Sequence, residues 1–411
     1  MSNTNSETPL TLEILQKAVK ENATAFRCRR RLQPAGGPGD KVFPPTYEGG
    51  QYATEDRVID GKRIPCVLLD SVQSQANRME LALREAFYHG KDKASDIPVV
   101  TVDFAGAGLA EVGEVTSLDA PHRLADAIIR DSLLGDTKFR STEQGKILDT
   151  ATLANATGLF GICPTALLFG LWDSTGPRGG LGTKFQRALV GELIGVDVQS
   201  GVRSSSRLDP LGIQLSAGPL YQDKDGGWTL DEKQAKKKNG TALKVGKDGK
   251  PSEANHGNVT PTLNQGHGGV SLSYVLQSVV ISLPALRRLR FPGVDGATTP
   301  ERDLAARTCL TALGLAGAVL SIEQGCDLRS RCLLTPELGQ TGWEIVKANG
   351  EAVPIALTSE SVKALFMAAR DAAKKEKLPW ISNPLILKPS PGLAALVKKS
   401  RELAMHTEEE G

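Results

Sequence analysis

Three basic side chains surround a glycine-rich turn in the stretch FGLWDSTGPRGGLGTKFQRALVGELIGVD, residues 169–197. Glycines let a backbone approach a ligand closely and point its N–H groups at an anion. A following helix would add the partial positive charge of its N-terminus. A bound phosphate is therefore the natural occupant, either in a nucleotide or in a polymer, and a structural turn with solvated basic side chains is the alternative. The residues concerned are Arg178, Gly179, Gly180, Lys184 and Arg187, with Gly176 and Gly182.

Established phosphate-binding and catalytic motifs do not fit this turn. A Walker A motif needs glycine directly before its lysine, whereas Thr183 precedes Lys184 here. The dinucleotide fingerprint fails because Phe185 stands where a small residue is needed. The segment that begins at Asp173 resembles the turn of aspartic proteases with one residue too many, and the chain has no second copy of it. A nucleotide-binding enzyme is therefore the weaker interpretation.

Two further polar segments could hold phosphates. Residues 71–78 begin a helix directly after the apolar run 64–70, where their side chains could bind backbone oxygens of a nucleic acid. Helix capping plus a solvated face is the alternative. Residues 203–207 predict a short cationic loop, with an ordinary solvated loop as the alternative. The candidates are Ser71, Gln73, Ser74, Asn77, Arg78, Arg203, Ser205 and Arg207.

Basic residues also cluster in two other places, although the net charge is only +2. The run FRCRRRL at 26–32 holds four arginines. On a strand, alternation would place Arg29 and Arg31 on one face and Arg30 on the other. The region 222–258 is rich in lysine and poor in apolar residues, so it predicts a mobile loop or lobe. Four of its lysines could steer DNA, although such runs are commonly just solvated: Lys233, Lys236, Lys237 and Lys238.

The sequence gives little support for a metal or a cofactor. Six cysteines and five histidines are scattered, without the spacing of a zinc site. We expect reduced, mostly buried thiols, no metal and no cofactor. Asp173 and Asp209, beside the two basic segments, are the residues to test for metal-assisted RNA cleavage.

Composition places the chain among globular proteins, with 411 residues, 40% hydrophobic and 5% aromatic. No apolar run reaches the roughly 18 uncharged residues needed to cross a bilayer. The N-terminus lacks the pattern of a signal peptide. We therefore expect a cytoplasmic protein without membrane association.

The elements that must position these residues alternate irregularly, which favours an α+β fold over a strict βαβ series. Periodicity predicts a short helix within residues 1–25 and a hairpin at Asn349-Gly350, whose dipeptide favours a type I′ turn. Further strands are expected at 64–70, 97–104, 164–173 and 270–283, and further helices at 71–90, 120–134, 183–197, 301–323, 359–378 and 392–405.

Four long segments resemble one known family. They are RRRLQPAGGPGDKVFPPTY (29–47), LLDSVQSQANRMELAL (68–83), ALLFGLWDSTGPRGGLGTKFQRALVGELIGVD (166–197) and RSSSRLDPLGI (203–213). Together they look like the RAMP backbone subunit of type I-G (formerly I-U) CRISPR Cascade effector complexes. The resemblance spans most of the chain, but no motif matches the Lys-rich region.

The resemblance implies a modified RRM or ferredoxin-like palm, an antiparallel sheet with helices on one face and inserted finger and thumb elements. Residues 1–25 would be a polar lead with a short helix, and 26–411 a single RAMP domain with the Lys-rich insertion. Copies of such a subunit stack into a helical filament along a CRISPR guide RNA in antiviral defence. Other implied partners are target DNA, a large subunit, a fused guide-end-binding and processing subunit, and a helicase-nuclease recruited later.

A subunit that holds RNA of any sequence must contact phosphates and sugars and leave the base edges free. The candidate residues suit that task. The resemblance implies no catalytic residue, because the backbone subunit of type I systems is not the nuclease. The alternatives are an RNA-cleaving RAMP subunit that uses a loop aspartate, as in related type III systems, and a phosphate- or nucleotide-binding enzyme.

Overall fold

The structure is a computed structural model that describes residues 8–21, 23–174, 182–338 and 342–409. The chain divides into two compact units. The first comprises residues 1–47, 52–198 and 272–394, and the second comprises residues 48–51, 199–271 and 395–411.

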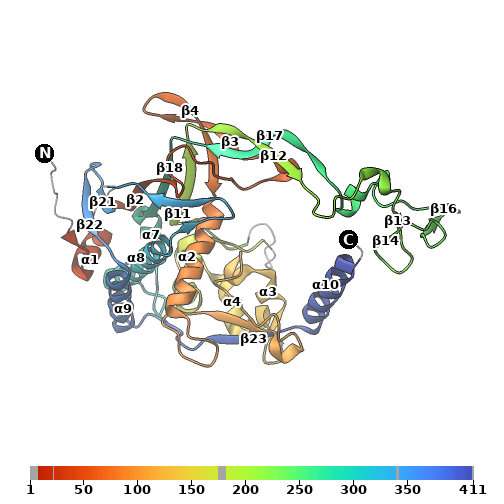
Figure 1. Ribbon diagram of the computed structural model, residues 1–411. Coiled ribbons are helices and arrows are strands. Elements are labelled where there is room, and N and C mark those ends of the chain that lie inside the picture. Colours follow the sequence, from red (N-terminus) through yellow and green to blue (C-terminus); the bar gives the residue numbers. More distant parts are fainter. Residues whose placement is uncertain (1–7, 22, 175–181, 339–341, 410–411) are drawn as a thin grey trace. The chain divides into compact units, whose positions relative to one another are not determined.

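A ten-stranded sheet dominates the first unit (Figure 1). Its main path runs β1-β22-β21-β2-β18-β11-β4-β3, and the hairpin β19-β20 joins it through β2. All described pairs in it are antiparallel except β1 with β22. The bounds are β1 Thr8–Pro9, β2 Ala23–Pro34, β3 Thr54–Ile59, β4 Lys62–Asp70, β11 Leu189–Val196, β18 Tyr274–Ser282, β19 Cys326–Asp327, β20 Leu333–Pro336, β21 Trp343–Lys347 and β22 Ala352–Ala356.

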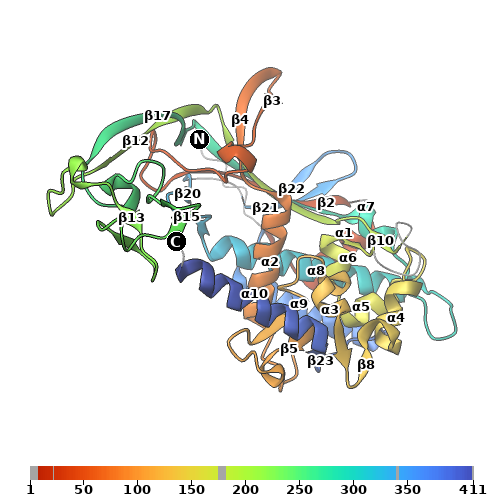
Figure 2. The ribbon, with the colours of Figure 1, turned by 90° about the vertical axis from the view of Figure 1, so that its right-hand side faces the viewer.

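Alternation along the central strands gives this sheet one apolar face. On β2 the side chains of Phe26, Cys28 and Leu32 are buried, whereas Arg29 and Arg31 are exposed. Alternate residues of β18 are buried along its whole length. Helices α2 (Val72–Phe87) and α8 (Pro300–Glu323) contact these strands and lie on one side of the sheet in both views (Figures 1 and 2).

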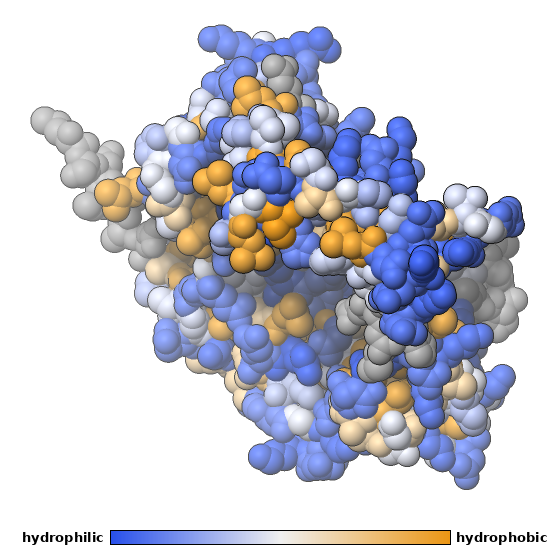
Figure 3. Space-filling model, turned by 45° about the vertical axis from the view of Figure 1, so that its right-hand side comes forward, coloured by the Kyte–Doolittle hydropathy of each residue, from blue (hydrophilic) through white to orange (hydrophobic). Residues whose placement is uncertain are grey.

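Helix α8 forms the centre of the core. It is long and apolar enough to span a membrane by length and composition, but 83% of its most apolar window is buried inside the protein. Burial around nearly its whole circumference explains why the helix lacks an amphipathic pattern. Hydrophilic residues cover most of the face shown in Figure 3, and apolar residues form separate small groups there.

A second sheet of five short strands completes the first unit, in the order β6-β5-β23-β7-β8. Its bounds are β5 Val100–Asp103, β6 Glu114–Thr116, β7 Ser132–Leu134, β8 Thr137–Lys138 and β23 Leu385–Pro389. Strand β9 (Leu171–Trp172) precedes the glycine-rich turn in the sequence, and β10 (Lys184–Phe185) follows it. The two strands pair as an antiparallel ribbon. The remaining helices are α1 Leu12–Lys20, α3 Ala127–Arg130, α4 Glu143–Thr150, α5 Thr157–Ile162, α6 Thr165–Phe169, α7 Leu283–Arg287, α9 Ser359–Lys375 and α10 Pro391–Glu409, of which α10 continues into the second unit.

The second unit is built on a long antiparallel ribbon of β12 (Gln199–Arg207) and β17 (Val259–Ser271). Between them lie two small hairpins, β13-β14 and β15-β16. Few apolar side chains are buried here, as the composition of 222–258 predicts. The hairpin bounds are β13 Tyr221–Gln222, β14 Trp228–Thr229, β15 Lys237–Lys238 and β16 Thr241–Ala242.

The α+β expectation is confirmed, because antiparallel pairing dominates and the arrangement is consistent with an RRM-like fold. The strand-then-helix unit at 64–87 is present as β4 and α2, with Ser71 as the N-cap. The expected strands near 97–104 and 270–283 appear as β5 and β18, and the expected N-terminal and three later helices appear as α1, α8, α9 and α10.

Two sequence predictions of secondary structure are wrong around the glycine-rich turn. In the run 164–173, Thr165–Phe169 form helix α6 and only Leu171–Trp172 form a strand, because a short apolar run buried on all sides has no diagnostic period. Residues 183–197 form β10 and β11 rather than an amphipathic helix. β11 pairs with β18 and β4 inside the sheet. Its neighbouring residues Leu193 and Ile194 are both buried, on opposite faces, whereas Val190 is exposed. No helix N-terminus therefore follows the turn.

The expected helix at 120–134 is also wrong, because the segment breaks into a 3-10 turn at Arg123–Ala125, the short α3 and strand β7. Arg123 adopts a left-handed φ of 53°, which ends any continuous helix. Asp126 then caps α3 by accepting from the Ile128 N–H.

The hairpin at Asn349-Gly350 is present as β21-β22, but its turn is not type I′. Among its central residues only Gly350 has a positive φ, of 86°. A type I′ turn requires positive φ at both central positions.

A buried ion pair links α2 to the broken segment. Arg123 Nε and Nη2 each donate to a carboxylate oxygen of Glu80 at 2.7 Å, and Nη1 donates to the Gly170 carbonyl at 3.1 Å. The two side chains are 7% and 2% exposed. Burial raises the pKa of Glu80 to about 7 despite the opposing effect of the Arg123 charge. The pair therefore fixes α2, the 121–126 segment and the end of α6 together.

Replacing Arg123 with Met should lower the free energy of unfolding by about 3–5 kcal/mol, the usual cost of removing one partner of a buried pair. The pKa of Glu80, already about 7, rises further in the variant. A raised carboxyl pKa favours the folded state only while the group is protonated. The loss of stability in Arg123→Met should therefore be smaller at low pH and should grow as the pH rises through the pKa of Glu80. Urea unfolding at acidic and alkaline pH measures the difference.

The matched control is the double variant Glu80→Met/Arg123→Met, which buries neither charge and should regain most of the lost stability. An Arg123→Met deficit of equal size at both pH values would contradict a charged Glu80 as its cause.

Candidate nucleic-acid interface

A cavity of about 810 Å³ lies in the first unit between α2, the 121–123 segment and the β9-β10 ribbon. Gln73 and Asn77 line it from α2, and Lys184 and Arg187 line it from the chain after the glycine-rich turn. Two sequence motifs that are a hundred residues apart thus supply four predicted residues to one site. The volume is suited to a group of nucleotide size.

Local geometry explains how these side chains reach the cavity. Ser71 caps α2 by accepting from the Ser74 N–H at 3.2 Å, which fixes where the helix begins. Within the helix, Gln73 and Asn77 share one face because they are four residues apart. On β10 the Phe185 side chain is buried, which turns its neighbour Lys184 outward. Gly170 has a φ of 87°, and a side chain there would meet the backbone of residues 185 and 187.

The cavity lining is positively charged. No Asp or Glu lies among its lining residues, whereas Arg123, Lys184 and Arg187 do. The charge of Arg123 is balanced by its ion pair with Glu80, which does not line the cavity. Lys184 and Arg187 are exposed and form no ion pair or hydrogen bond with the described part of the chain. Two cationic side chains are therefore available to an anionic ligand.

An aromatic ring adds a stacking surface. Trp172 lines the cavity and is 56% exposed, and the Lys184 ammonium lies 5.6 Å from its ring centroid. β9 and β10 pair these two residues directly. An exposed ring beside a cation is the arrangement that binds the face of a nucleobase next to its phosphate.

Sequence reasoning missed Trp172, Arg123 and Gln186 at this site. Trp172 was within the segment of interest, and a tryptophan beside a basic glycine turn is a usable signal. Arg123 gave no such signal, because its partner Glu80 lies 43 residues away in the sequence.

Ser71 and Arg78 make contacts within the protein. Ser71 is the α2 cap, as the alternative interpretation expects. Arg78 forms an ion pair with the buried Asp70 at 3.1 Å and donates to the Leu328 carbonyl at 2.9 Å. Ser74 is half-buried and, like these two, does not line the cavity.

The alternation expected for the arginine run is confirmed on β2. Arg30 lies on the inner face, where its Nε donates to Gln277 at 2.5 Å. Arg29 and Arg31 are exposed on the opposite face, and the Arg31 guanidinium lies 4.1 Å from the ring centroid of Tyr274. They do not line the cavity.

The basic segment 203–207 is part of strand β12 rather than a loop, so that expectation is wrong. Its residues pair with β17. Arg203 and Ser205 are exposed, and the Ser205 hydroxyl bonds to Thr262 at 2.8 Å. Arg207 is half-exposed and lies 4.0 Å from Asp209. The four lysines, Lys233, Lys236, Lys237 and Lys238, are exposed in the same unit.

Three candidates, Arg178, Gly179 and Gly180, lie outside the described residues.

The two aspartates considered for catalysis are both engaged by the protein. The Asp173 side chain is 4% exposed and pairs with Arg140 at 2.9 Å. Asp209 accepts from the N–H groups of Ile213 at 2.9 Å and Gly257 at 3.0 Å. Desolvation raises the pKa of Asp209, but these backbone donors outweigh it, so the pKa lies below its ordinary value. Asp209 thus orders the loop that follows β12.

Within the described ranges, no group of three or more His, Cys, Asp and Glu side chains could hold a metal ion. All six cysteines are buried and unpaired. Burial raises the pKa of Cys28 to about 11, which keeps it a protonated and unreactive thiol.

Residues 26–200 match the family model of the CRISPR-associated protein GSU0053 (Cas_GSU0053). No curated protein matches the chain. The matched region covers less than half of the chain, but it contains every residue that lines the positively charged cavity. Over these residues the chain is therefore similar to a CRISPR-associated protein family.

Proposed function

We propose that this protein is a non-catalytic backbone subunit of a CRISPR effector complex that holds the guide RNA by contacts independent of sequence. The observation that carries the proposal is the cavity in the CRISPR-associated region, lined by free cations and amides and by no carboxylate. Such a surface suits phosphate and sugar oxygens, which are common to all nucleotides.

The composition of the cavity favours this mode of binding over base readout. Lys184 and Arg187 would neutralise phosphates, and Gln73 and Asn77 would donate to phosphate or 2′-hydroxyl oxygens. Trp172 would stack on whichever base is adjacent, since every base has a π-face. The base edges of the remaining nucleotides would then stay free to pair with target DNA.

Further basic surfaces support a polymeric ligand over a single nucleotide. Arg29 and Arg31 on β2, and Arg203 on β12, are exposed and do not line the cavity. A ligand with many phosphates could engage several such side chains, whereas a single nucleotide could not. We extend the proposal to helical stacking of copies along the RNA, to association with the other Cascade subunits, and to a cytoplasmic location, with Lys233 and Lys236 to Lys238 available to target DNA.

Engagement of Asp173 and Asp209 supports a role without catalysis. A metal-assisted nuclease needs a carboxylate that is free to bind an ion at the scissile phosphate. Here one carboxylate is paired with an arginine, and the other is held by backbone N–H groups.

The double variant Lys184→Gln/Arg187→Gln should lose most of the guide RNA that copurifies after coexpression with a CRISPR array and the neighbouring subunits. The slope of log affinity against log salt should fall by about 1.4 in magnitude, since each phosphate contact on a single strand contributes about 0.7. RNA sequencing and fluorescence anisotropy over a series of salt concentrations measure the two effects.

The matched control, Lys363→Gln/Lys375→Gln, removes the same charge from exposed positions on α9, away from the cavity. It should retain the RNA. Equal loss in both variants, or a nucleic-acid-free protein that binds a small nucleotide, would contradict the proposal.

The variants Asp173→Asn and Asp209→Asn should leave RNA cleavage unchanged from the wild-type protein, which should not cut RNA in the presence of Mg²⁺. Asp209→Asn should instead make the second unit more sensitive to proteolysis. Because the pKa of Asp209 is lowered in the folded state, its stabilising effect is present above the ordinary Asp pKa and is lost as the pH falls through the folded value. Wild-type cleavage that either variant abolishes would establish the nuclease alternative.

A further inference from the structure

A second basic cavity, of about 450 Å³, lies in the first unit beside the start of α8. Arg287 at the end of α7, Arg290 in the segment that follows, and Arg307 on α8 all line it. Lys20 of α1 also lies at its edge. None of the residues lining this cavity lines the first one.

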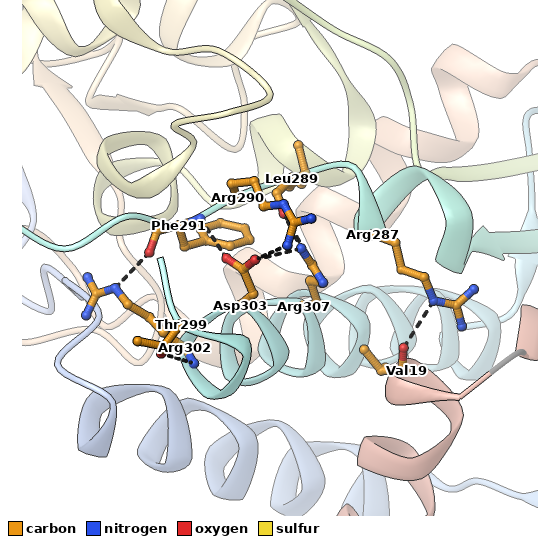
Figure 4. Close-up of polar contacts among 9 residues, drawn as sticks. All are labelled: Val19, Arg287, Leu289, Arg290, Phe291, Thr299, Arg302, Asp303 and Arg307. Atoms are coloured by element: carbon orange, nitrogen blue, oxygen red, sulfur yellow. Dashed lines mark hydrogen bonds and ion pairs between the residues drawn. The ribbon is translucent and has the colours of Figure 1, made fainter. Parts of the chain in front are cut away.

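One carboxylate organises two of the three guanidinium groups. Asp303 is 2% exposed, and its Oδ2 accepts from Arg290 at 2.6 Å and from Arg307 at 3.0 Å. Its Oδ1 accepts from the Phe291 N–H at 2.9 Å. Figure 4 shows Arg290 and Arg307 both directed at Asp303. The carboxylate accepts three hydrogen bonds, and it cancels only one of the two guanidinium charges.

The third guanidinium has no carboxylate partner in the described chain. Arg287 donates to backbone carbonyls. Its Nε donates to Val19 at 3.2 Å, as Figure 4 shows, and its Nη2 donates to Ala23 at 2.7 Å. Carbonyl groups stabilise the guanidinium but leave its charge unbalanced. Counting Lys20 and Glu301 as well, the charges that line the cavity are four positive and two negative, which leaves an excess of +2.

Several N–H groups of these arginines remain unused. No atom of the described residues accepts from Nη1 of Arg287, from Nη1 of Arg307, or from Nε and Nη2 of Arg290. Arg307 is 13% exposed and its main chain is fixed within α8, so its donors have a set direction. Burial lowers the pKa of Arg307, and the neighbouring charges of Arg290 and Arg287 lower it further against the opposing Asp303.

We propose that this cavity binds a phosphate-type oxyanion between Arg287, Arg290 and Arg307. Such an ion would accept from the unused donors and balance the charge excess, and planar guanidiniums match phosphate oxygens in pairs. The N-terminus of α8 is not part of this site. The Thr299 hydroxyl already caps that terminus by accepting from the Arg302 N–H at 3.2 Å. The inference goes beyond the proposed function, since it does not depend on guide-RNA binding in the first cavity.

The test titrates inorganic phosphate into the full chain at constant ionic strength by isothermal calorimetry. Arg290→Gln should weaken phosphate binding by about tenfold, because hydrogen bonds to charged groups are worth roughly this factor. Arg290 is 55% exposed, so its replacement perturbs the core little. Lys20→Gln, at an exposed position, should weaken binding in the same direction and provides a second variant.

Two controls separate this site from the first cavity. Arg288→Gln removes an equal charge from an exposed neighbour that does not line the site. Lys184→Gln/Arg187→Gln removes the free charges of the first cavity. Arg288→Gln should bind phosphate as the wild-type protein does. In the Lys184→Gln/Arg187→Gln background, Arg290→Gln should still weaken the remaining phosphate binding by about tenfold.

Competition identifies the source of the phosphate group. A 5′-phosphorylated oligonucleotide that displaces inorganic phosphate from the wild-type protein but not from Arg290→Gln indicates a nucleic acid, and displacement by a nucleoside monophosphate alone indicates a small ligand. Absence of phosphate binding in the wild-type protein would overturn the proposal. Wild-type affinity for phosphate in both Arg290→Gln and Lys20→Gln would also overturn it. Loss of binding only in Lys184→Gln/Arg187→Gln would also overturn it, without affecting the proposed function.

Discussion

The bidentate pair between Glu80 and Arg123 is the interaction on which the first cavity depends. It ties α2 to the 121–126 segment, and its third donor reaches the Gly170 carbonyl before β9. These three elements are walls of the cavity. Arg123 holds a left-handed backbone conformation, which is costly for a residue with a side chain and persists only where surrounding contacts fix it. A buried charge and a strained turn thus keep the binding surface in place.

The sequence predicts those elements whose pattern is local. Strand β4, the α2 cap and the amphipathic helices α9 and α10 follow from periodicity and capping residues, whereas α8 follows from the length of its apolar run. β11 was not predictable in this way, because it lies between two strands and is apolar on both faces. The break at Arg123 depends on Glu80, which is distant in the sequence. Contacts of this kind are absent from any local pattern.

The candidate site shows the same division. Gln73, Asn77, Lys184 and Arg187 were identified from residue type and position, and the structure brings them to one cavity. Lys184 was identified correctly although the helix predicted after the turn is wrong. Side chains alternate along β10, and this exposes Lys184 just as the start of a helix would have done. The physical origin of the attraction for anions differs from the prediction, however. Its positive potential comes from side chains alone and not from a helix dipole.

The number of arginines in a segment is a poor measure of how many can bind a nucleic acid. Arg30 is bound to Gln277, Arg78 to Asp70 and Arg27 to Glu344, and each of these contacts uses charge or donors inside the protein. What distinguishes Lys184 and Arg187 is the lack of any carboxylate in the lining around them. A free cation in a carboxylate-free cavity retains its full attraction for phosphate, whereas a carboxylate partner cancels part of the attraction of a paired one. The balance of charge within a cavity, which only the fold determines, therefore decides which basic residues can form an interface.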